Sequence, residues 1–284
     1  MKKAELIAPH TGIPSFYKAP VVDINKVQKG DAVIAGVPMD HGIVLTRTGT
    51  RYGPRAIREA SLFYRAVQEG VSEKTSVNVQ TKKAQRLKER IKLVDIGDIP
   101  IYPQDIKQTS ESITEDVSFL VKNQTLPVLL GGDHYITYPA FEGLCKGFSE
   151  LKDNPKIGHI HIDSHTDFRD SYAGLGKFNH GTSVRRLSEN PMIEYKNIAW
   201  VGLNGNVLDS DIYNIYKKEG LKMITSGDIV DNGIESAIVE AVEAAGDGTD
   251  AVYLSIDIDV VDTAYAPGTG IPVFEGITSK DFLI

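Results

Sequence analysis

The segment IGHIHIDSHTD, residues 157–167, joins an apolar run to a dense cluster of possible ligands. Ile157–Ile162 is short and apolar, as expected for a strand that is buried on both faces of a parallel sheet. Polar side chains follow at once, in Asp163-Ser164-His165-Thr166-Asp167. Functional groups of open parallel sheets gather at the carboxyl ends of the strands. The segment therefore predicts an α/β protein with a site at that edge of its sheet.

Six further runs of the same kind occur, and a Gly- or Asp-rich turn and then a helical pattern follow each of them. They are Ala32–Val37, Lys92–Ile96, Leu126–Leu130, Ile198–Leu203, Leu221–Thr225 and Ala251–Ile256. Apolar residues recur at helical spacing in two places, at Ile113, Val117 and Leu120 and at Ile234, Ile238 and Val242. A helix start is expected at Pro54. This order predicts a doubly wound βαβ sheet.

Length and composition fit one large domain that spans residues 1–284. Hydrophobic residues make up 41% and charged residues 24%, which is ordinary globular usage. The formal net charge of -7 gives no attraction to nucleic acid or anionic lipid and suits a small cationic substrate. The polar segment Glu73–Arg90 is interpreted as a solvated loop and surface helix.

The expected location is the reducing cytoplasm. Cys145 is the only cysteine, so no intrachain disulfide can form. No apolar run approaches the roughly 20 residues that span a bilayer, and the N-terminus lacks the apolar core of a signal peptide.

Three strand ends carry metal-binding residue types. One is the end of Ile157–Ile162. In addition, Leu126–Leu130 runs into Gly131-Gly132-Asp133-His134, and Ala251–Ile256 runs into Asp257-Ile258-Asp259. Alternate side chains of extended backbone share a face, which groups Asp257 with Asp259 and Asp163 with His165 and Asp167. Ile258 is then expected to point into the core.

Carboxylates gathered in this way repel one another and are costly to desolvate unless cations pair with them. Two divalent ions balance four aspartates. The predicted ligands are His134, Asp163, His165, Asp167, Asp257 and Asp259. Imidazole and carboxylate without thiolate favour Mn, Fe or Zn, and an oxygen-rich site favours manganese. Residues interpreted as ordinary core or supporting groups are His10, His41, His159, His161 and Asp133.

These three strand ends, in this order and spacing, resemble the metal-binding signatures of the ureohydrolases, the arginase and agmatinase family. Further matches are Gly36-Val37-Pro38-Met39-Asp40, Arg51–Arg58, Val94–Ile99, His180-Gly181-Thr182 and Ala266–Gly270, so the resemblance covers nearly the whole chain. It implies a three-layer α/β/α sandwich with a central, mostly parallel sheet and two Mn²⁺ per chain. It also implies the release of urea from a small guanidino substrate, and a homo-oligomer, either a trimer or a hexamer.

The chain departs from the family pattern in several places. Ser164 stands where relatives usually have Ala, and Asn204 where many have Arg. After Gly276–Asp281 the family continues through a helix and a further interior strand, whereas this sequence stops at Ile284. The 284 residues are therefore expected to be an incomplete record of the natural chain, unless the missing element is supplied in another way.

The expected chemistry is attack on the guanidinium carbon by a hydroxide that two cations share. His180 lies thirteen residues after Asp167 and matches the proton-shuttling histidine of the family. Its ordinary alternative is a loop histidine that only forms hydrogen bonds. His180 and Asp167 are the predicted catalytic residues.

Two residues bear on the choice of substrate. Asp281 occupies the position of the family's guanidinium-binding Glu, although it also suits the first turn of a helix. Arg169 and Gly176 stand where the arginase branch has Asn and Ser for the arginine α-carboxylate and amine, so arginine is disfavoured. The stretch Phe168–Tyr172 looks like some bacterial agmatinases, which makes agmatine the predicted substrate.

Alternatives remain within the family and outside it. Arg169 would attract the carboxylate of 4-guanidinobutanoate, unless Asp170 neutralises it. A formimino substrate, as for a formimidoylglutamase, keeps the fold and changes the bond. Two alternative functions belong to a different class: a two-metal phosphoesterase and a noncatalytic family member. No P-loop is present, and all six ligand positions are intact.

Overall fold

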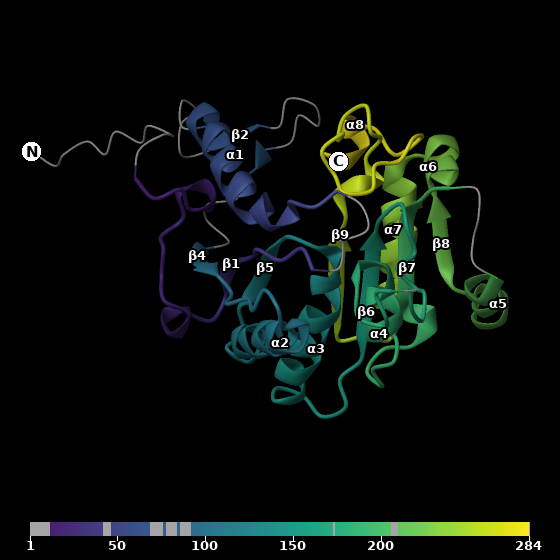
Figure 1. The fold of residues 1–284 in the computed structure, drawn as a ribbon, viewed down its shortest axis with the longest axis horizontal. Coiled ribbons are helices and arrows are strands. Elements are labelled where there is room, and N and C mark those ends of the chain that lie inside the picture. The colour runs from purple at the N-terminus through teal and green to yellow at the C-terminus, as the bar shows by residue number, and fades with distance from the viewer. Residues whose placement is uncertain are drawn as a thin grey trace, which may run out of the picture.

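Parallel strands form the centre of the molecule (Figure 1). The computed structural model describes residues 12–41, 47–68, 76–77, 84–85, 92–172, 174–205 and 210–283. All seven predicted runs are strands, with small shifts at their ends. They are β1 (Asp31–Val37), β4 (Lys92–Asp98), β5 (Leu126–Gly131), β6 (Ile157–Ile162), β7 (Ile198–Leu203), β8 (Lys222–Thr225) and β9 (Ala251–Ile256).

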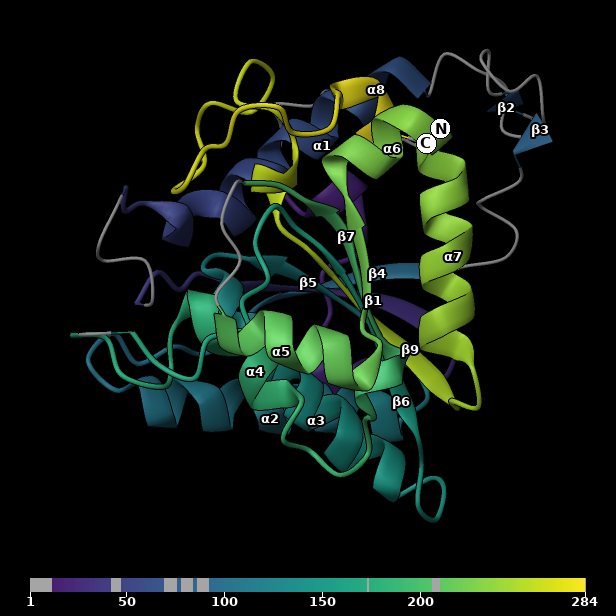
Figure 2. The ribbon, with the colours of Figure 1, turned by 90° about the vertical axis from the view of Figure 1, so that its right-hand side faces the viewer.

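Helices cover the strands on both faces, which gives the predicted three-layer α/β/α arrangement (Figures 1 and 2). On one face lie α2 (Ile106–Lys122), α3 (Thr137–Ser149), α4 (Ser183–Leu187) and α5 (Ser210–Glu219). On the other lie α1 (Gly53–Gln68), α6 (Ser226–Asn232) and α7 (Ile234–Gly246), and the short α8 (Ser279–Phe282) follows later in the chain.

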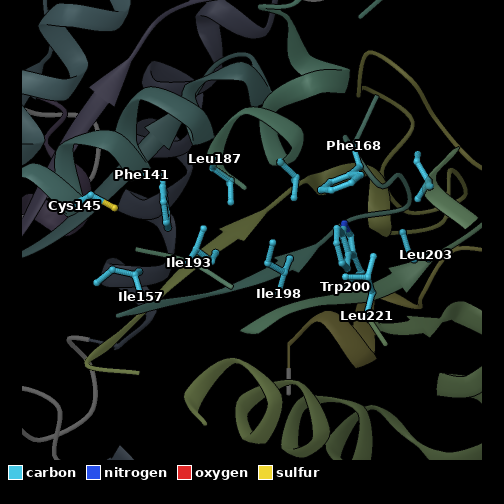
Figure 3. Packing of buried hydrophobic residues seen from close by; sticks show 12 residues of the cluster. Phe141, Cys145, Ile157, Phe168, Leu187, Ile193, Ile198, Trp200, Leu203 and Leu221 are labelled. Carbon is cyan, nitrogen blue, oxygen red and sulfur yellow. The ribbon is translucent and has the colours of Figure 1, made fainter. Parts of the chain in front are cut away.

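The core between the first group of helices and the strands is built from large apolar side chains. Phe141 of α3, Leu187 of α4 and Trp200 of β7 are fully buried there, together with Phe168 (Figure 3). Phe168 lies in the segment that follows β6. Its ring meets that of Trp200 edge-on, with the ring centroids 5.7 Å apart. The core thus extends to the edge of the sheet where the predicted ligands lie.

Helix α7 turns a face rich in alanine toward the sheet. Its buried residues are Ile234, Ala237, Ala241 and Ala245, whereas Val242 is 52% exposed. Small alanine side chains let this helix approach the sheet closely, so the larger valine faces outward. The helix itself is present as predicted; Ile234 is buried and Ile238 packs partly buried against the same core, so of the three predicted positions only Val242 faces outward.

The strands belong to two sheets, ordered β4-β1-β5 and β8-β7-β6-β9, and every pairing within them is parallel. β5 and β9 are the edges nearest the site, and no described strand pairs with their outer sides. Leu126 of β5 and Leu254 of β9 are 57% and 51% exposed, while β1 and β7 are buried throughout. The expectation that every strand is buried on both faces therefore fails for β5 and β9, each of which has one edge that no described strand pairs with.

The polar segment 73–90 is described only at two short strands. β2 (Ser76–Val77) and β3 (Ala84–Gln85) pair antiparallel with each other, so these four residues do not form the expected surface helix. The rest of this segment, like His10 and Ile284, lies outside the described residues. None of the described helices has the length and apolarity needed to cross a bilayer.

Candidate metal centre

A glycine-dependent turn positions His134 after β5. Gly132 has a positive φ of 29°, and a Cβ at this position would lie 2.4 Å from the carbonyl oxygen of Val37. Only glycine fits so close to another backbone without strain. The next residue, Asp133, accepts a hydrogen bond from the Tyr135 backbone N–H, which starts the short helical turn that carries His134. This supports the prediction that Asp133 holds the loop in place.

The ligands after β6 and β9 sit in tight turns instead of in continued strand. The carboxylate of Asp163 accepts a hydrogen bond from the His165 backbone N–H at 2.6 Å, and that of Asp257 accepts one from the Asp259 N–H at 3.0 Å. Such turns break the alternation of side chains. Ile258 is accordingly 48% exposed, and the expectation that it points into the core was wrong.

Asp167 closes the segment after β6 in a left-handed conformation, with φ at 47°. Its carbonyl oxygen accepts hydrogen bonds from the backbone N–H groups of Val184 and Arg185, at 3.0 and 3.2 Å. Ser183 lies next to these residues, and its hydroxyl donates to Asp167 Oδ2 at 3.3 Å. The start of α4 therefore fixes both the backbone and the carboxylate of Asp167.

Three carboxylates surround one nitrogen of His134. Its Nδ1 lies 2.9 Å from Asp163 Oδ2, 2.9 Å from Asp257 Oδ2 and 3.4 Å from Asp167 Oδ2. The strand ends after β5, β6 and β9 thus meet at one point, as the sequence predicts. An imidazole nitrogen carries at most one proton, so it cannot satisfy three carboxylates.

A second group lies beside the first and shares Asp163 with it. His165 Nδ1 is 3.4 Å from Asp163 Oδ1 and 3.2 Å from Asp259 Oδ2. Two sets of side chains in the described residues are close enough to hold a metal ion: His134, His161, Asp163 and Asp167, and Asp163, His165 and Asp259. Asp257 approaches the first set through His134. All six predicted ligands are therefore gathered here, with His161 in addition.

Several buried polar atoms at this point lack a hydrogen-bond partner among the described residues. Both nitrogens of His134, whose Nδ1 lies among three carboxylates, are among these atoms. Unsatisfied buried polar atoms are costly and call for an explanation, of which an ion is one. Nitrogen and carboxylate oxygen are also the donor atoms that suit Mn, Fe and Zn. The residues present therefore fit a pair of divalent cations.

The pKa values of the acidic groups show how crowded the site is without metal. Burial, and next the charge of Asp163, raises the pKa of Asp167 well above its usual range. Burial and the same charge also raise the pKa of Asp259. Asp163 itself differs: burial opposes its ionisation, but its interactions with His161, His134 and His165 hold its pKa well below normal.

His161 is the residue that the sequence interpretation missed. It was assigned to the core as an ordinary histidine, and it is indeed fully buried, but its Nε2 lies 3.1 Å from Asp163 Oδ2. Burial lowers the pKa of His161, so the imidazole is neutral. The signal was available in the sequence, because residues two apart on a strand share a face and His161 precedes Asp163 by two. His159 lies further from the ligands and keeps the core assignment.

A cavity of about 1320 Å³ opens over both groups of ligands. Small-molecule sites are usually about 300–1,000 Å³, so this space holds a small substrate with water to spare. His180, Arg169 and Tyr172 line it beside the ligands. The Tyr172 ring stacks on His180 with centroids 6.3 Å apart, and the guanidinium of Arg169 lies 5.0 Å from the Tyr172 centroid. His180 and Arg169 thus face the same space as the ligands.

Asp281 is placed elsewhere. Its carboxylate accepts hydrogen bonds from the Thr278 hydroxyl and backbone N–H at 2.6 and 3.2 Å, which caps α8. It is not among the residues that line the cavity. The structure thus shows the helix-capping role, and substrate binding by Asp281 stays a prediction. Asn204 does line the cavity, and its amide donates to the carbonyl oxygen of Phe274.

A parallel α/β fold with imidazoles and carboxylates in two adjoining groups at the carboxyl ends of its strands suits a metal-dependent hydrolase. Residues 30–284 match the Arginase family, and the chain belongs to that family. It is accordingly an amidinohydrolase, an enzyme that cleaves amidino or guanidino groups.

Known proteins of this kind are similar over most of their length. The guanidinobutyrase of Pseudomonas aeruginosa is 33% identical over 251 residues, which cover 88% of this chain and 71% of the relative. The agmatinase of Bacillus anthracis is 32% identical over 262 residues, 90% of this chain and 77% of the relative. The structure of proclavaminate amidino hydrolase from Streptomyces clavuligerus matches with a TM-score of 0.77 at 27% identity, over 97% of this chain and 83% of that one.

The pH dependence of metal-free stability follows from the histidines. Burial lowers the pKa of His165, but Asp163 and Asp259 raise it to about 11. A histidine whose folded pKa exceeds its unfolded value of about 6.5 stabilises the fold fully below that pH and loses its effect as the pH rises. His161 has a lowered pKa, and its contribution changes only below 6.5. Between pH 7.0 and 8.5 the metal-free protein should therefore become less stable.

Metal binding should oppose this loss, because a ligand must shed its proton before it binds an ion. The rise in Tm on adding a fixed excess of Mn²⁺ is thus expected to be larger at pH 8.5 than at pH 7.0. Thermal unfolding of chelated protein, with and without Mn²⁺ at the two pH values, measures it. A rise that is equal at both pH values, or larger at pH 7.0, would contradict the protonation of His165.

Proposed function

We propose that this enzyme releases urea from a small guanidino compound with two Mn²⁺ ions bound by His134, Asp163, His165, Asp167, Asp257 and Asp259. One observation carries the proposal: the ends of β5, β6 and β9 bring four aspartates and two histidines into two groups that share Asp163. Membership of the arginase family supports the reaction class. Oxygen-rich ligation without thiolate supports manganese.

The reaction breaks the C–N bond between the guanidinium carbon and the alkyl amine, and water supplies the oxygen of urea. Bound divalent cations supply a water nucleophile ionised near neutral pH and positive charge close to the reacting carbon. His180 lines the cavity beside the ligands, where it delivers a proton to the departing amine nitrogen. The stack of Tyr172 on His180 holds the imidazole toward this space.

Agmatine, which yields putrescine and urea, is the substrate that we propose first. The similarity to an agmatinase supports it, and the net charge of -7 favours a cationic substrate over an anionic one at long range. The enzyme is proposed to work in the cytoplasm as a single-domain subunit of a trimer or hexamer.

A guanidino acid such as 4-guanidinobutanoate is the second candidate, and the surroundings of Arg169 favour it. Asp170, the expected neutralising partner of Arg169, pairs with other cations instead: its Oδ1 lies 2.7 Å from Arg186 Nη2 and its Oδ2 lies 3.2 Å from Lys177 Nζ. Within the described residues Arg169 pairs with no carboxylate, and its guanidinium lies over the Tyr172 ring. A positive charge at the mouth attracts a substrate carboxylate and repels the ammonium of agmatine. The similarity to a guanidinobutyrase agrees with this alternative.

A side-by-side urea assay of Mn²⁺-loaded enzyme with agmatine, 4-guanidinobutanoate and arginine tests the proposal. Urea from agmatine at a kcat/KM well above that for arginine is the expected result. A higher value for 4-guanidinobutanoate than for agmatine would select the second candidate. Urea from none of the three would contradict the proposed reaction and direct attention to formimino substrates.

Replacing Arg169 with Gln should shift the choice of substrate toward agmatine. The change removes a positive charge, so kcat/KM should rise for agmatine and fall for 4-guanidinobutanoate. Arg169 is exposed, and solvent weakens its field; a change in the ratio of roughly tenfold at low salt is expected, with less at high salt. Lys177→Gln, whose charge Asp170 already offsets, is the matched control. An unchanged ratio in R169Q would exclude Arg169 from substrate selection.

A further inference from the structure

We infer that His161 is a positioning residue that, from the buried strand β6, fixes the orientation of Asp163. Asp163 is the carboxylate common to both groups of candidate ligands, so its orientation affects the binding of both ions. The inference rests on the metal-binding role proposed above and is independent of which guanidino compound is cut.

The two oxygens of Asp163 have different partners, and Oδ2 lies between His134 Nδ1 at 2.9 Å and His161. Oδ1 accepts the hydrogen bond from the His165 backbone N–H at 2.6 Å, and Oδ2 lies 3.1 Å from His161 Nε2. The backbone contact belongs to the turn after β6, whereas His161 approaches from within the sheet. The His161 side chain is fully buried, with 0% exposure. It therefore offers Asp163 a rigid partner that water cannot replace.

The neighbours of His161 decide which of its nitrogens carries the proton. Deeper in the core, His159 Nδ1 lies 3.2 Å from the carbonyl oxygen of Tyr253, which can only accept, so His159 carries its proton on Nδ1. The Ser255 hydroxyl lies 2.9 Å from His161 Nδ1 and 3.5 Å from His159 Nε2. It has one proton, and the shorter distance directs that proton to His161.

A neutral imidazole whose Nδ1 accepts a hydrogen bond carries its own proton on Nε2. His161 Nε2 therefore carries the proton and lies 3.1 Å from Asp163 Oδ2, and a protonated nitrogen cannot bind a metal ion. This places His161 behind the ligand and not among the ligands, although it is close enough to be counted with them. The parallel stack of the His161 ring on that of His134, with centroids 4.9 Å apart, fixes the plane of both rings.

The test is Mn²⁺ binding by protein from which a chelator has removed all metal, measured by equilibrium dialysis without substrate. Loss of hydrogen bonds to metal ligands typically weakens metal binding by roughly 10–100-fold. We expect a loss of this size in His161→Phe, which keeps a flat ring but has no donor. His161→Gln, whose side-chain amide N–H can reach the position of Nε2, should recover most of the affinity. His159→Phe, a buried histidine of the same strand that does not contact Asp163, should bind like wild type.

Wild-type affinity and two ions per chain in His161→Phe would overturn the inference, as would an equal loss in His159→Phe. Ser255→Ala keeps the side chain small and removes the hydroxyl that fixes the His161 proton, so it should weaken Mn²⁺ binding severalfold. This variant provides the test if His161→Phe does not fold. An unchanged affinity in Ser255→Ala would then overturn the inference. Absence of Mn²⁺ binding by the wild type would overturn the metal role itself, and urea release can be lost without affecting this test.

Discussion

Replacing Asp163 with Asn should abolish urea release by the Mn²⁺-loaded enzyme. Asp163 is shared by both groups of candidate ligands, so one change impairs both ions. Metal ions stabilise transition-state charge by several kcal/mol, and each 1.4 kcal/mol corresponds to about tenfold in rate, so kcat should fall by at least about a thousandfold. A urea assay at saturating agmatine, together with the manganese content of the purified protein, measures both effects.

Asp167→Asn provides a contrast that separates loss of metal from loss of fold. It should also abolish activity, yet the two variants should differ in metal-free stability. Burial and the Asp163 charge raise the pKa of Asp167, so its ionised form destabilises the metal-free fold at neutral pH, and Asn should raise the Tm. The histidines hold the pKa of Asp163 low, so Asn there should lower the Tm.

Asp262→Asn is the matched control for both variants. Asp262 lies three residues beyond Asp259, accepts a hydrogen bond from the Ala264 backbone N–H and does not line the cavity. Activity in Asp262→Asn should stay near the wild-type level. Retention of two manganese ions and normal turnover in Asp163→Asn would show that the proposed ligand set is wrong.

Replacing His180 with Ala should lower kcat by roughly 10²–10⁴-fold and leave manganese content unchanged. General acid–base catalysis by a positioned side chain typically contributes this much. His180 lines the cavity, but it belongs to neither group of candidate ligands. The expected result is therefore a slow enzyme with a full metal complement, which steady-state kinetics and elemental analysis distinguish from an empty one.

His180→Asn separates proton transfer from hydrogen bonding, because the amide can form hydrogen bonds but cannot take up and release a proton near neutral pH. It should be nearly as slow as His180→Ala. Added imidazole should restore part of the activity of the alanine variant, since it can occupy the vacated space and carry the proton. Turnover in His180→Ala that equals the wild type would remove this residue from the mechanism.

The strands could be predicted because buried parallel strands consist of continuous apolar runs, which polar turns and helices interrupt. The predictions about the fold that failed concern features that depend on contacts between distant segments. The inward face of α7 follows from how closely the helix approaches the sheet, and its alanines carry too little hydrophobic signal to outweigh Val242. That β5 and β9 are edge strands of two sheets likewise depends on how the strands pair, which the local sequence does not record.

The meeting of the six predicted ligands could be predicted because the carboxyl ends of parallel strands lie together, and here those of both sheets do so. The detailed orientation could not. Alternation of side chains stops where a strand ends, and the turn at Asp257 therefore leaves Ile258 exposed. His161 was misassigned for the opposite reason: it lies within the strand, where a buried histidine is usually a core residue, and its spacing of two residues from Asp163 was given too little weight beside the 3.1 Å approach that the structure shows.

The position of Trp200 gives this protein a built-in optical reporter. It is the only tryptophan in the chain, and its indole Nε1–H donates to the carbonyl oxygen of Thr166 at 2.9 Å. Thr166 stands between His165 and Asp167, so movement of these candidate ligands reaches the indole through one hydrogen bond. Fluorescence excited at the indole band should therefore change when the segment after β6 rearranges around an ion, and paramagnetic Mn²⁺ should quench it more than diamagnetic Zn²⁺ does. Filling of the site can thus be followed in real time, without substrate and without an added dye.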